Sequence, residues 1–596
     1  MKASDLKKKY LDFFVKKGHQ ILSNVSLIPE NDPSALFINS GMHPLIPYLL
    51  GETHPLGKRL VSKQRCLRTQ DIEKIGNSSH LTFFEMLGNW SLGGYWKKEA
   101  IEWSWEFLTK ELNLDHKRIS VSCFAGDKDS PKDEESAKIW KSLGIPSERI
   151  YFLGKEENWW SVGETGPCGP DTEMFYDTGQ KACGPDCRPG DNCGKYFEIW
   201  NDVFMEFNRL PNGKLEKLKQ KNIDTGMGVE RTAAMLQGKD DIYQTELFSG
   251  LINQIEEISK KKYEDNNQKA MRIIADHLRA ATFAIADGVI PSNTETGYVV
   301  RRLIRRTIRY GRQLDINQLF TFKIAEKVIL SYQKEYSHLK ENQDLVLDQL
   351  QFEEEKFQKA LQKGLKEFEK IINSDLIDKT KKIPGKSVFF LYETYGFPWE
   401  LTAELAKEKG LLVAREEFFK FQKEHQEKSR VSSNKKFAGG LADHSQEVTK
   451  LHTATHLLHQ ALRQILGEQV RQVGSNITPE RLRFDFTYSE KLTPGQIKEV
   501  EDLINEQITQ DLVVKMEMMS LEKAKKQGAL AFFTDKYGEK VKVYSIGDPS
   551  TGSGQVFSQE VCGGPHVNSL GEIGRVKIMK EEAVGAGRRR IYARIK

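Results

Sequence analysis

The chain has 596 residues, of which 29% are charged, and its formal net charge at pH 7 is +5. No stretch approaches the ~18 apolar residues of a membrane-spanning helix, and the N-terminus lacks the apolar core of a signal peptide. The composition therefore excludes a membrane protein, and the 7 cysteines are too sparse for a disulfide framework. We expect a cytoplasmic protein of several domains.

Residues 1–245 form the first predicted domain, in which strand-like and helical patterns alternate. RISVSCF at 118–124 and EIWNDVFMEFN at 198–208 are rich in β-branched and aromatic residues, which favours strands. KKEAIEWSWEFLTKEL at 97–112 has helical periodicity. These patterns predict an α+β domain.

Three cysteines lie in a loop rich in Gly and Pro, CGPDCRPGDNC, at Cys183, Cys187 and Cys193. Zinc binds four such ligands in a tetrahedron, and either Cys168 or Asp191 would complete the set. The alternative is three free thiols on a surface loop. The sequence leaves both interpretations open.

Residues 246–440 are predicted to be mainly helical. Between 345 and 373 apolar residues recur at spacings of three, four and seven, which is typical of a helix with one buried face. A polar stretch at 427–447 indicates a linker. A second helix carries the motif RRLIRRTIRYGR, with arginines at Arg301, Arg302, Arg305, Arg306, Arg309 and Arg312. This density suits contact with a phosphate backbone, and a solvated basic face is the alternative.

The last predicted domain, 441–596, is again α+β and contains two short motifs far apart in sequence. HTATH places His452 and His456 one turn apart on a helix, so that both imidazoles can reach one ion. CGGPH adds Cys562 and His566, and three histidines with one cysteine suit zinc. The residue after His452 is threonine rather than glutamate, so the metalloprotease motif HExxH is absent.

HTATHLLHQALRQ, GSNITPERLRFDF and CGGPH together resemble the editing domain of alanyl-tRNA synthetases, which is related to that of threonyl-tRNA synthetases and to free-standing deacylases. The usual motif of the family is CGGTH, and this chain has Pro565 in place of the threonine.

The front of the chain resembles the class II aminoacyl-tRNA synthetases. The stretches that carry this resemblance are CLRTQD at 66–71, HLTFFEMLGNWS at 80–91, NWWSVGETGPCGPDTEMFY at 158–176, EIWNDVFMEFNR at 198–209 and DTGMGVER at 224–231. The resemblance implies a multidomain α+β fold. Its parts would be a catalytic domain built on an antiparallel sheet, a helical tRNA-recognition domain and a zinc-containing α+β editing domain.

The resemblance also implies roles for single residues. Arg68 would contact the α-phosphate of ATP and Arg231 the γ-phosphate, where fixed guanidinium groups neutralise developing charge. Asp224 would hold the ammonium group of the amino acid. The other implied contacts are Asp71, His80, Phe84, Gly226 and Gly228 for ATP, and Trp160 and Val203 for the alanine side chain.

Further implied roles concern the tRNA. In the family an Asn and an Asp read a G·U pair of the acceptor stem; Asn293 matches the first, and Glu400 stands where relatives have Asp. Arg301 and Arg305 are expected to contact the RNA backbone. Gln472 is the implied polar contact of the editing site. Four protein ligands would leave zinc no open position, so we expect it to organise that site rather than activate water.

We therefore predict ATP-dependent activation of alanine with Mg²⁺, transfer to its tRNA, and zinc-site hydrolysis of tRNA mischarged with serine or glycine. A hydrolytic site is needed because a small pocket rejects an added hydroxyl poorly. Two alternatives are a zinc-dependent deacylase with a non-catalytic front domain and a non-enzymatic RNA-binding module. The chain shows no coiled-coil heptads and ends soon after CGGPH, so a monomer is expected.

Overall fold

The computed structural model describes residues 1–29, 35–70, 72–191, 193–374, 377, 381–434, 445–488, 490–531, 540–547, 556–585 and 587–595. The chain divides into two compact units, Met1–Lys359 and Ala360–Lys596. The domain boundaries near 245 and 440 remain predictions. Within the described ranges no helix is both long and apolar enough to cross a bilayer.

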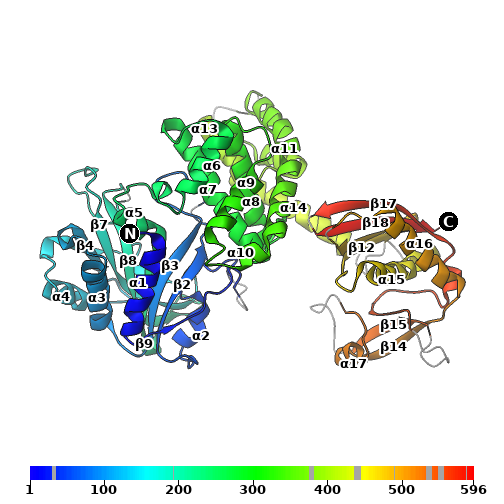
Figure 1. Ribbon diagram of the computed structural model, residues 1–596, viewed down its shortest axis with the longest axis horizontal. Helices are drawn as coiled ribbons and strands as arrows, with labels where there is room; N and C mark the ends of the chain where they lie inside the picture. Colours follow the sequence, from blue (N-terminus) through cyan, green and yellow to red (C-terminus); the bar gives the residue numbers. More distant parts are fainter. Residues whose placement is uncertain are drawn as a thin grey trace. The chain divides into compact units, whose positions relative to one another are not determined.

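A mixed sheet with antiparallel central strands forms the centre of the first unit (Figure 1). Its strand order is β1-β2-β3-β9-β8-β7-β4-β5, and β6 pairs with β7. The strands are β1 (Gln20–Ile21), β2 (Arg59–Leu67), β3 (Phe83–Leu92), β4 (Ile119–Phe124), β5 (Ile150–Leu153), β6 (Trp159–Ser161), β7 (Gly166–Asp177), β8 (Tyr196–Arg209) and β9 (Leu215–Gly228). Both strands predicted in this region, now β4 and β8, are confirmed.

One face of this sheet is covered by helices. They are α1 (Ala3–Lys16), α3 (Lys97–Glu106), α4 (Glu134–Ser142) and α5 (Val229–Leu236), while α2 (Ile46–Leu49) is a short segment elsewhere. The core between helices and sheet includes Tyr10, Phe107, Trp200 and Phe204, all at most 1% exposed. Because side chains alternate along a strand, the neighbours of these core residues point to the opposite face. That face carries the candidate site.

The rest of the first unit is helical. Its helices are α6 (Ser249–Ser259), α7 (Asp265–Ala286), α8 (Glu295–Gln313), α9 (Thr321–Tyr332), α10 (His338–Glu341) and the start of α11 (Gln343–Ile372). The helix predicted at 345–373 is confirmed by α11, and the arginine-rich stretch lies in α8.

The arginines of α8 do not form the exposed basic face that the sequence indicated. Arg305, Arg306 and Arg309 are all under 9% exposed. Arg305 donates to Glu353 of α11 over 2.7 Å, and Arg306 donates to the carbonyl of Ile72 over 2.9 Å. The periodicity placed these residues on a helix correctly, but α8 buries several of them among acceptors from other elements.

The second unit begins with the rest of α11, followed by α12 (Gly385–Tyr395), α13 (Trp399–Glu408) and α14 (Arg415–Asn434). The short strands β10 (Lys382–Ile383) and β11 (Leu412–Val413) pair in parallel. Of the linker expected at 427–447, residues 427–434 belong to helix α14 and 446–447 begin a further helix, 446–466. Residues 435–444 of that stretch lie outside the described residues.

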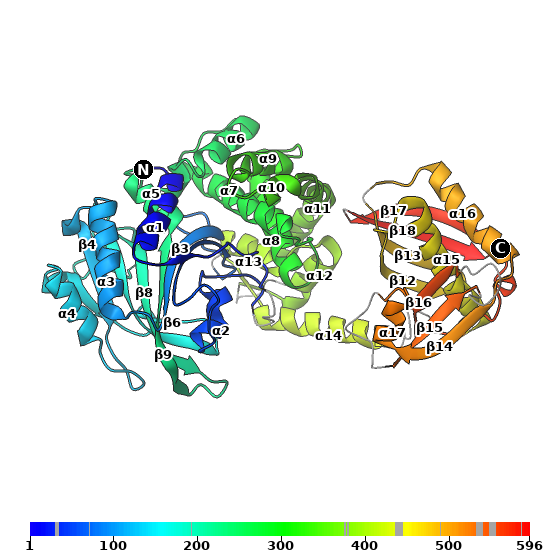
Figure 2. The ribbon, with the colours of Figure 1, turned by 60° about the horizontal axis from the view of Figure 1, so that its bottom comes forward.

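The C-terminal part of the second unit packs helices against two small sheets (Figure 2). Its helices are α15 (Gln446–Leu466), α16 (Pro494–Thr509) and α17 (Leu521–Lys526). The four-stranded sheet has the order β12 (Gln472–Thr478), β13 (Arg481–Thr487), β18 (Arg588–Ile595), β17 (Val576–Gly585). The other sheet comprises β14 (Val514–Ser520), β15 (Lys540–Ile546) and β16 (Ser558–Val561). The helix predicted to carry HTATH is confirmed by α15.

Candidate active site and candidate metal centre

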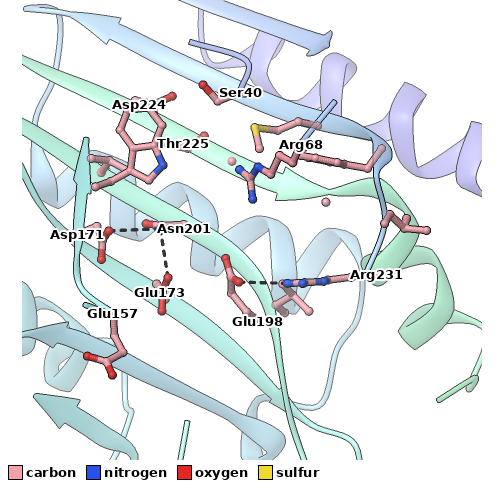
Figure 3. A pocket seen from close by; sticks show the side chains of 18 of the residues that line it. Ser40, Arg68, Glu157, Asp171, Glu173, Glu198, Asn201, Asp224, Thr225 and Arg231 are labelled. Atoms are coloured by element: carbon pink, nitrogen blue, oxygen red, sulfur yellow. Dashed lines mark hydrogen bonds and ion pairs between the residues drawn. The ribbon is translucent and has the colours of Figure 1, made fainter. Parts of the chain in front are cut away.

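A cavity of about 340 Å³ lies on the face of the first unit's sheet opposite the helical core (Figure 3). The register between neighbouring strands brings the cavity residues together, because residues directly opposite each other point to the same face of a sheet. Asp171 of β7 pairs with Val203 of β8, which pairs with Asp224 of β9. In the adjacent row Glu173 pairs with Asn201, and Asn201 pairs with Gly226.

The residues expected to bind alanine are brought together in this cavity. Trp160 and Val203 line it beside Asp224, and both belong to an apolar cluster around Trp90. The indole nitrogen of Trp90 donates to Asp224 Oδ1 over 2.6 Å. Burial raises the pKa of Asp224 to about 7, although the Trp90 hydrogen bond lowers it. A cation that paired with this carboxylate would favour its charged form.

Further carboxyl groups surround Asn201, which donates to Asp171 over 3.4 Å and to Glu173 over 3.3 Å (Figure 3). Burial raises the pKa of Asp171 to about 8, against hydrogen bonds from Asn158 and Asn201. Burial also raises the pKa of Glu173 well above its usual range, and nearby carboxylates add to the effect. The cavity thus holds an excess of acidic groups that suits cationic ligands.

Both arginines expected at the phosphates line the same cavity. Arg68 donates from Nε to the carbonyl of Asn39 over 3.1 Å, and its guanidinium lies 4.9 Å from the ring centroid of Phe84. Arg231 pairs with Glu198, with 3.1 Å between Nη1 and Oε2 (Figure 3). Each guanidinium is held in place while part of its hydrogen-bonding fork is left for a ligand.

Of the residues expected at the nucleotide, His80, Phe84, Gly226 and Gly228 also line the cavity. A Cβ at Gly228 would meet no atom within 4 Å, so the backbone there borders open space. Backbone without a side chain lets a ligand approach closely. The remaining expected contact, Asp71, lies outside the described residues.

Asp171, Glu173, Glu198 and Asn201 also line the cavity, and they were not identified as site residues from the sequence. The available signal was the spacing of two between Asp171 and Glu173 in a strand. This spacing alone does not identify the site, because placing Asp171 and Glu173 beside Asn201 requires knowledge of the register between β7 and β8. A register shift between Cys168 and Asp171 interrupts that pairing.

The second unit brings His452, His456, Cys562 and His566 into one cluster, with one ligand atom of each within 4.8 Å of the others. Helix α15 supplies the first two, and its start is fixed by Ser445, whose hydroxyl accepts from the Val448 amide. The distance from Cys562 Sγ to His452 Nε2 is 3.4 Å. Tetrahedral bonds of about 2.3 Å to sulfur and 2.0 Å to nitrogen place such atoms roughly 3.5 Å apart.

Hydrogen bonds orient two of these imidazoles toward the centre of the cluster. His452 Nδ1 lies 2.9 Å from the carbonyl of Pro565, which can only accept, so Nδ1 carries a proton and Nε2 faces Cys562 Sγ at 3.4 Å. His566 Nδ1 contacts the Thr453 hydroxyl over 3.2 Å, and that hydroxyl also contacts the Thr449 carbonyl. His566 Nε2 is buried without a hydrogen-bond partner among the described residues. These features are those of metal ligands held by a second shell.

Glu560 of β16 completes this arrangement. Its Oε1 lies 2.8 Å from His459 Nδ1, and its Oε2 lies 3.6 Å from His456 Nδ1. Burial opposes charge on His456, but Glu560 raises the pKa of this imidazole to about 9. Burial would raise the pKa of Cys562, yet the neighbouring imidazoles, with His452 the largest contributor, lower it to about 2. The cluster therefore favours the thiolate that a metal requires.

The cysteine loop also forms a cluster, in which the sulfurs of Cys183, Cys187 and Cys193 lie within 4.8 Å of one another. Cys168 is wrong as a fourth member, since it is fully buried in β7 and packs with Phe124 and Trp159. Asp191 lies nearer, with Oδ2 3.8 Å from Cys183 Sγ.

The residues expected at tRNA are spread over both units. Asn293 precedes α8, is exposed and accepts a hydrogen bond from Arg301, while Arg305 pairs with Glu353. Glu400 lies in the first turn of α13. Gln472 is the first residue of β12, a strand that packs against α15.

Known proteins resemble this chain throughout its length. The family model described as tRNA synthetases class II (A) matches residues 5–477, and the threonyl and alanyl tRNA synthetase second additional domain matches residues 541–592. The alanine–tRNA ligase of Treponema denticola is 56% identical, covering 99% of this chain and 98% of the relative. That of Treponema pallidum is 52% identical, with 100% and 98% covered, and that of Thermoanaerobacter sp. is 37% identical, with 99% and 79% covered.

Proposed function

This chain belongs to the class II tRNA synthetases, and from that premise we propose that it activates alanine with ATP and transfers it to tRNA. The observation that carries the proposal is the cavity in which Asp224, Trp160 and Val203 lie beside Arg68 and Arg231. One end suits a small amino acid with a cationic ammonium group. The other end suits a polyphosphate.

Asp224 binds the ammonium group of alanine, while Trp160 and Val203 limit the size of the side chain. The alanine carboxylate then attacks the α-phosphate of ATP and displaces pyrophosphate. Arg68 and Arg231 neutralise the charge that builds up on the attacked phosphate and on the leaving group, without having to reorganise. Phe84 stacks with adenine, and the open backbone at Gly228 admits the nucleotide.

The acidic residues of the cavity fit the Mg²⁺ that accompanies ATP. Hard cations prefer carboxylate oxygens, and Glu198 and Glu173 would supply them next to Arg231. Bound Mg²⁺ would neutralise phosphate charge. Glu198 also orients Arg231 before the nucleotide arrives, because the two side chains already form an ion pair over 3.1 Å.

Pyrophosphate exchange tests the ligase proposal directly. Exchange that depends on alanine, is weaker with serine and glycine, and is absent with larger amino acids is the expected outcome. A chain that exchanges only with another amino acid, or with none, would contradict it. The alternative of a deacylase with a non-catalytic front domain predicts no exchange, although Arg68, Asp224 and Arg231 all line one cavity.

A second activity, hydrolysis of mischarged tRNA, is favoured by the cluster in the second unit. We infer that His452, His456, Cys562 and His566 hold zinc, since one nitrogen of each imidazole and the Cys562 sulfur lie within 4.8 Å of one another. Four protein ligands would give the ion an organising role rather than that of a water activator. A small pocket such as that around Val203 excludes glycine and serine poorly, so a second site that hydrolyses the wrong esters would remove the resulting errors.

Substitution of Cys562 by Ala tests this second activity. The variant should lose the zinc of this cluster, measured by elemental analysis, and should hydrolyse seryl-tRNA more slowly while alanine exchange is retained. Cys66→Ala is a matched control, because Cys66 is a buried cysteine in the first unit. Parental hydrolysis of seryl-tRNA by Cys562→Ala would contradict the proposal.

For tRNA we retain Asn293, Arg301, Arg305 and Glu400 as candidate contacts. Of these, Asn293 has the exposure that base recognition requires, whereas Arg305 would have to exchange its pairing with Glu353 for a phosphate. Gln472 remains the candidate polar contact of the hydrolytic site. The monomeric state also remains a prediction, which light scattering would test.

A further inference from the structure

The connection between β7 and β8 gathers three sulfur atoms that neither proposed activity uses. Cys187 Sγ and Cys193 Sγ are 3.6 Å apart. Two sulfurs bound to one tetrahedral zinc at about 2.3 Å lie roughly 3.7 Å apart. A disulfide would instead need about 2.05 Å. The spacing therefore fits two ligands of a common ion.

A carboxylate lies beside one of the three sulfurs, which are themselves within 4.8 Å of one another. Asp191 Oδ2 lies 3.8 Å from Cys183 Sγ, close to the roughly 3.5 Å expected between oxygen and sulfur on one zinc ion. The backbone amide of Arg188 donates to the same oxygen over 2.8 Å, which fixes the side chain toward the sulfurs. The backbone of Lys195 hydrogen-bonds the thiol of Cys193. Such outer contacts are characteristic of built metal sites.

The base of the connection is closed before any ion binds. The Thr178 amide donates to the carbonyl of Lys195 over 2.8 Å, and Lys195 forms an ion pair with Asp177 over 2.9 Å. The cysteine-bearing segment is therefore a loop with fixed ends rather than an unconstrained chain. A fixed base reduces the entropy that a metal must overcome to order the remainder.

We propose that Cys183, Cys187, Cys193 and Asp191 form a second zinc site, in the β7–β8 loop. Three thiolates and one carboxylate give a closed tetrahedral set, so the site is structural rather than catalytic. The position of this site between β7 and β8 indicates its structural role. Asp171 and Glu173 lie on β7 and Glu198 and Asn201 on β8, so an ion that fastens the loop also holds together the two strands that supply the cavity's acidic residues.

The test is the zinc content of the full chain purified without chelators. The parent should contain two zinc ions, and Cys187→Ser and Cys562→Ser should each contain one. The double variant should contain none. Hydrogen exchange of the backbone amides between β7 and β8 should become faster in Cys187→Ser and remain unchanged in Cys562→Ser, which separates this site from the histidine cluster.

A pair of aspartates in the same loop refines the test. Asp191→Asn should lower the affinity for added zinc by more than about tenfold. Asp186→Asn, at the exposed residue that directly precedes Cys187, should not lower it. The proposal is overturned if the parent contains one zinc ion that only Cys562→Ser removes. It is equally overturned if mass spectrometry finds Cys187 and Cys193 joined as a disulfide in protein purified under reducing conditions.

Discussion

The pKa values of buried acidic groups are shifted in opposite directions in the cavity of the first unit and in the histidine cluster of the second. In the cavity, burial raises the pKa of Asp171 and Asp224, so these carboxyl groups retain protons near neutral pH. In the cluster, neighbouring histidines lower the pKa of Cys562 so that its thiol is ionised. Carboxyl groups that are protonated in the empty cavity are suited to cationic groups that bind and are released again. A cysteine that has already lost its proton is suited to a resident ion.

The two sites also rest on separate hydrophobic cores. The cavity is supported by the clusters around Trp200 and Trp90, whereas the histidine cluster is supported by one that includes Leu457 and Phe484. Each core lies within one compact unit. Substitutions at one site should therefore leave the chemistry of the other unchanged, and each of the following predictions tests that independence.

The largest effect is expected at Arg231. Arg231→Ala removes a guanidinium that stabilises charge only as it develops, so alanine-dependent exchange should fall by about 10²–10³-fold. Hydrolysis of seryl-tRNA should be unaffected. Arg149→Ala, at an arginine whose hydrogen bonds go to the carbonyls of His116 and Ile119, is the control and should exchange normally. Equal loss of both activities in Arg231→Ala would show that the sites are coupled.

A smaller effect is expected at Glu560, which contacts two histidines but would not bind the ion itself. Glu560→Gln keeps the shape of the side chain and removes its charge, so zinc affinity should fall by about 10–100-fold. Competition with a chromogenic chelator measures this. Glu517→Gln, in an exposed residue of the same small sheet, should bind zinc like the parent. If both variants keep parental affinity, Glu560 does not tune the cluster.

The third effect concerns pH. The pKa of Asp224 is raised to about 7, so its carboxylate is lost as pH falls below that value. Since the ammonium of alanine needs the carboxylate, kcat/KM for alanine should be constant above pH 7 and fall by about tenfold per pH unit below it. Ester hydrolysis in the other unit should not share this midpoint.

A tryptophan variant sharpens the pH prediction. The Trp90 hydrogen bond lowers the pKa of Asp224, so Trp90→Phe should move the midpoint to higher pH whatever its effect on the absolute rate. Trp96 packs against the helical core on the other face of the sheet, so Trp96→Phe should leave the midpoint of the pH profile unchanged. A midpoint that stays fixed in Trp90→Phe would assign the titration to another group.

The two sites also differ in how much the sequence revealed. All four ligands of the histidine cluster were predicted, because HTATH and CGGPH each carry two ligands at a spacing that local geometry fixes. Asp171, Glu173 and Glu198 were missed, since their meeting depends on which strands are neighbours and in which register. The burial of several arginines of α8 was not predicted, for a related reason. Helical periodicity shows which residues share a face, but not that Glu353 of another helix will meet that face.

The paired rows of the cavity have an evolutionary consequence. Val203 and Asn201 of β8 each lie opposite cavity residues on both neighbouring strands. One residue inserted into β8 on either side of this pair would turn the side chains beyond the insertion toward the helical core. Length changes should therefore be tolerated best at the hairpin ends, such as 178–195 and 210–214, and inside the strands only where a β-bulge absorbs them. Related chains should differ in length at those two segments and keep the number of residues between Asp171 and Asp177, and between Glu198 and Val203, unchanged.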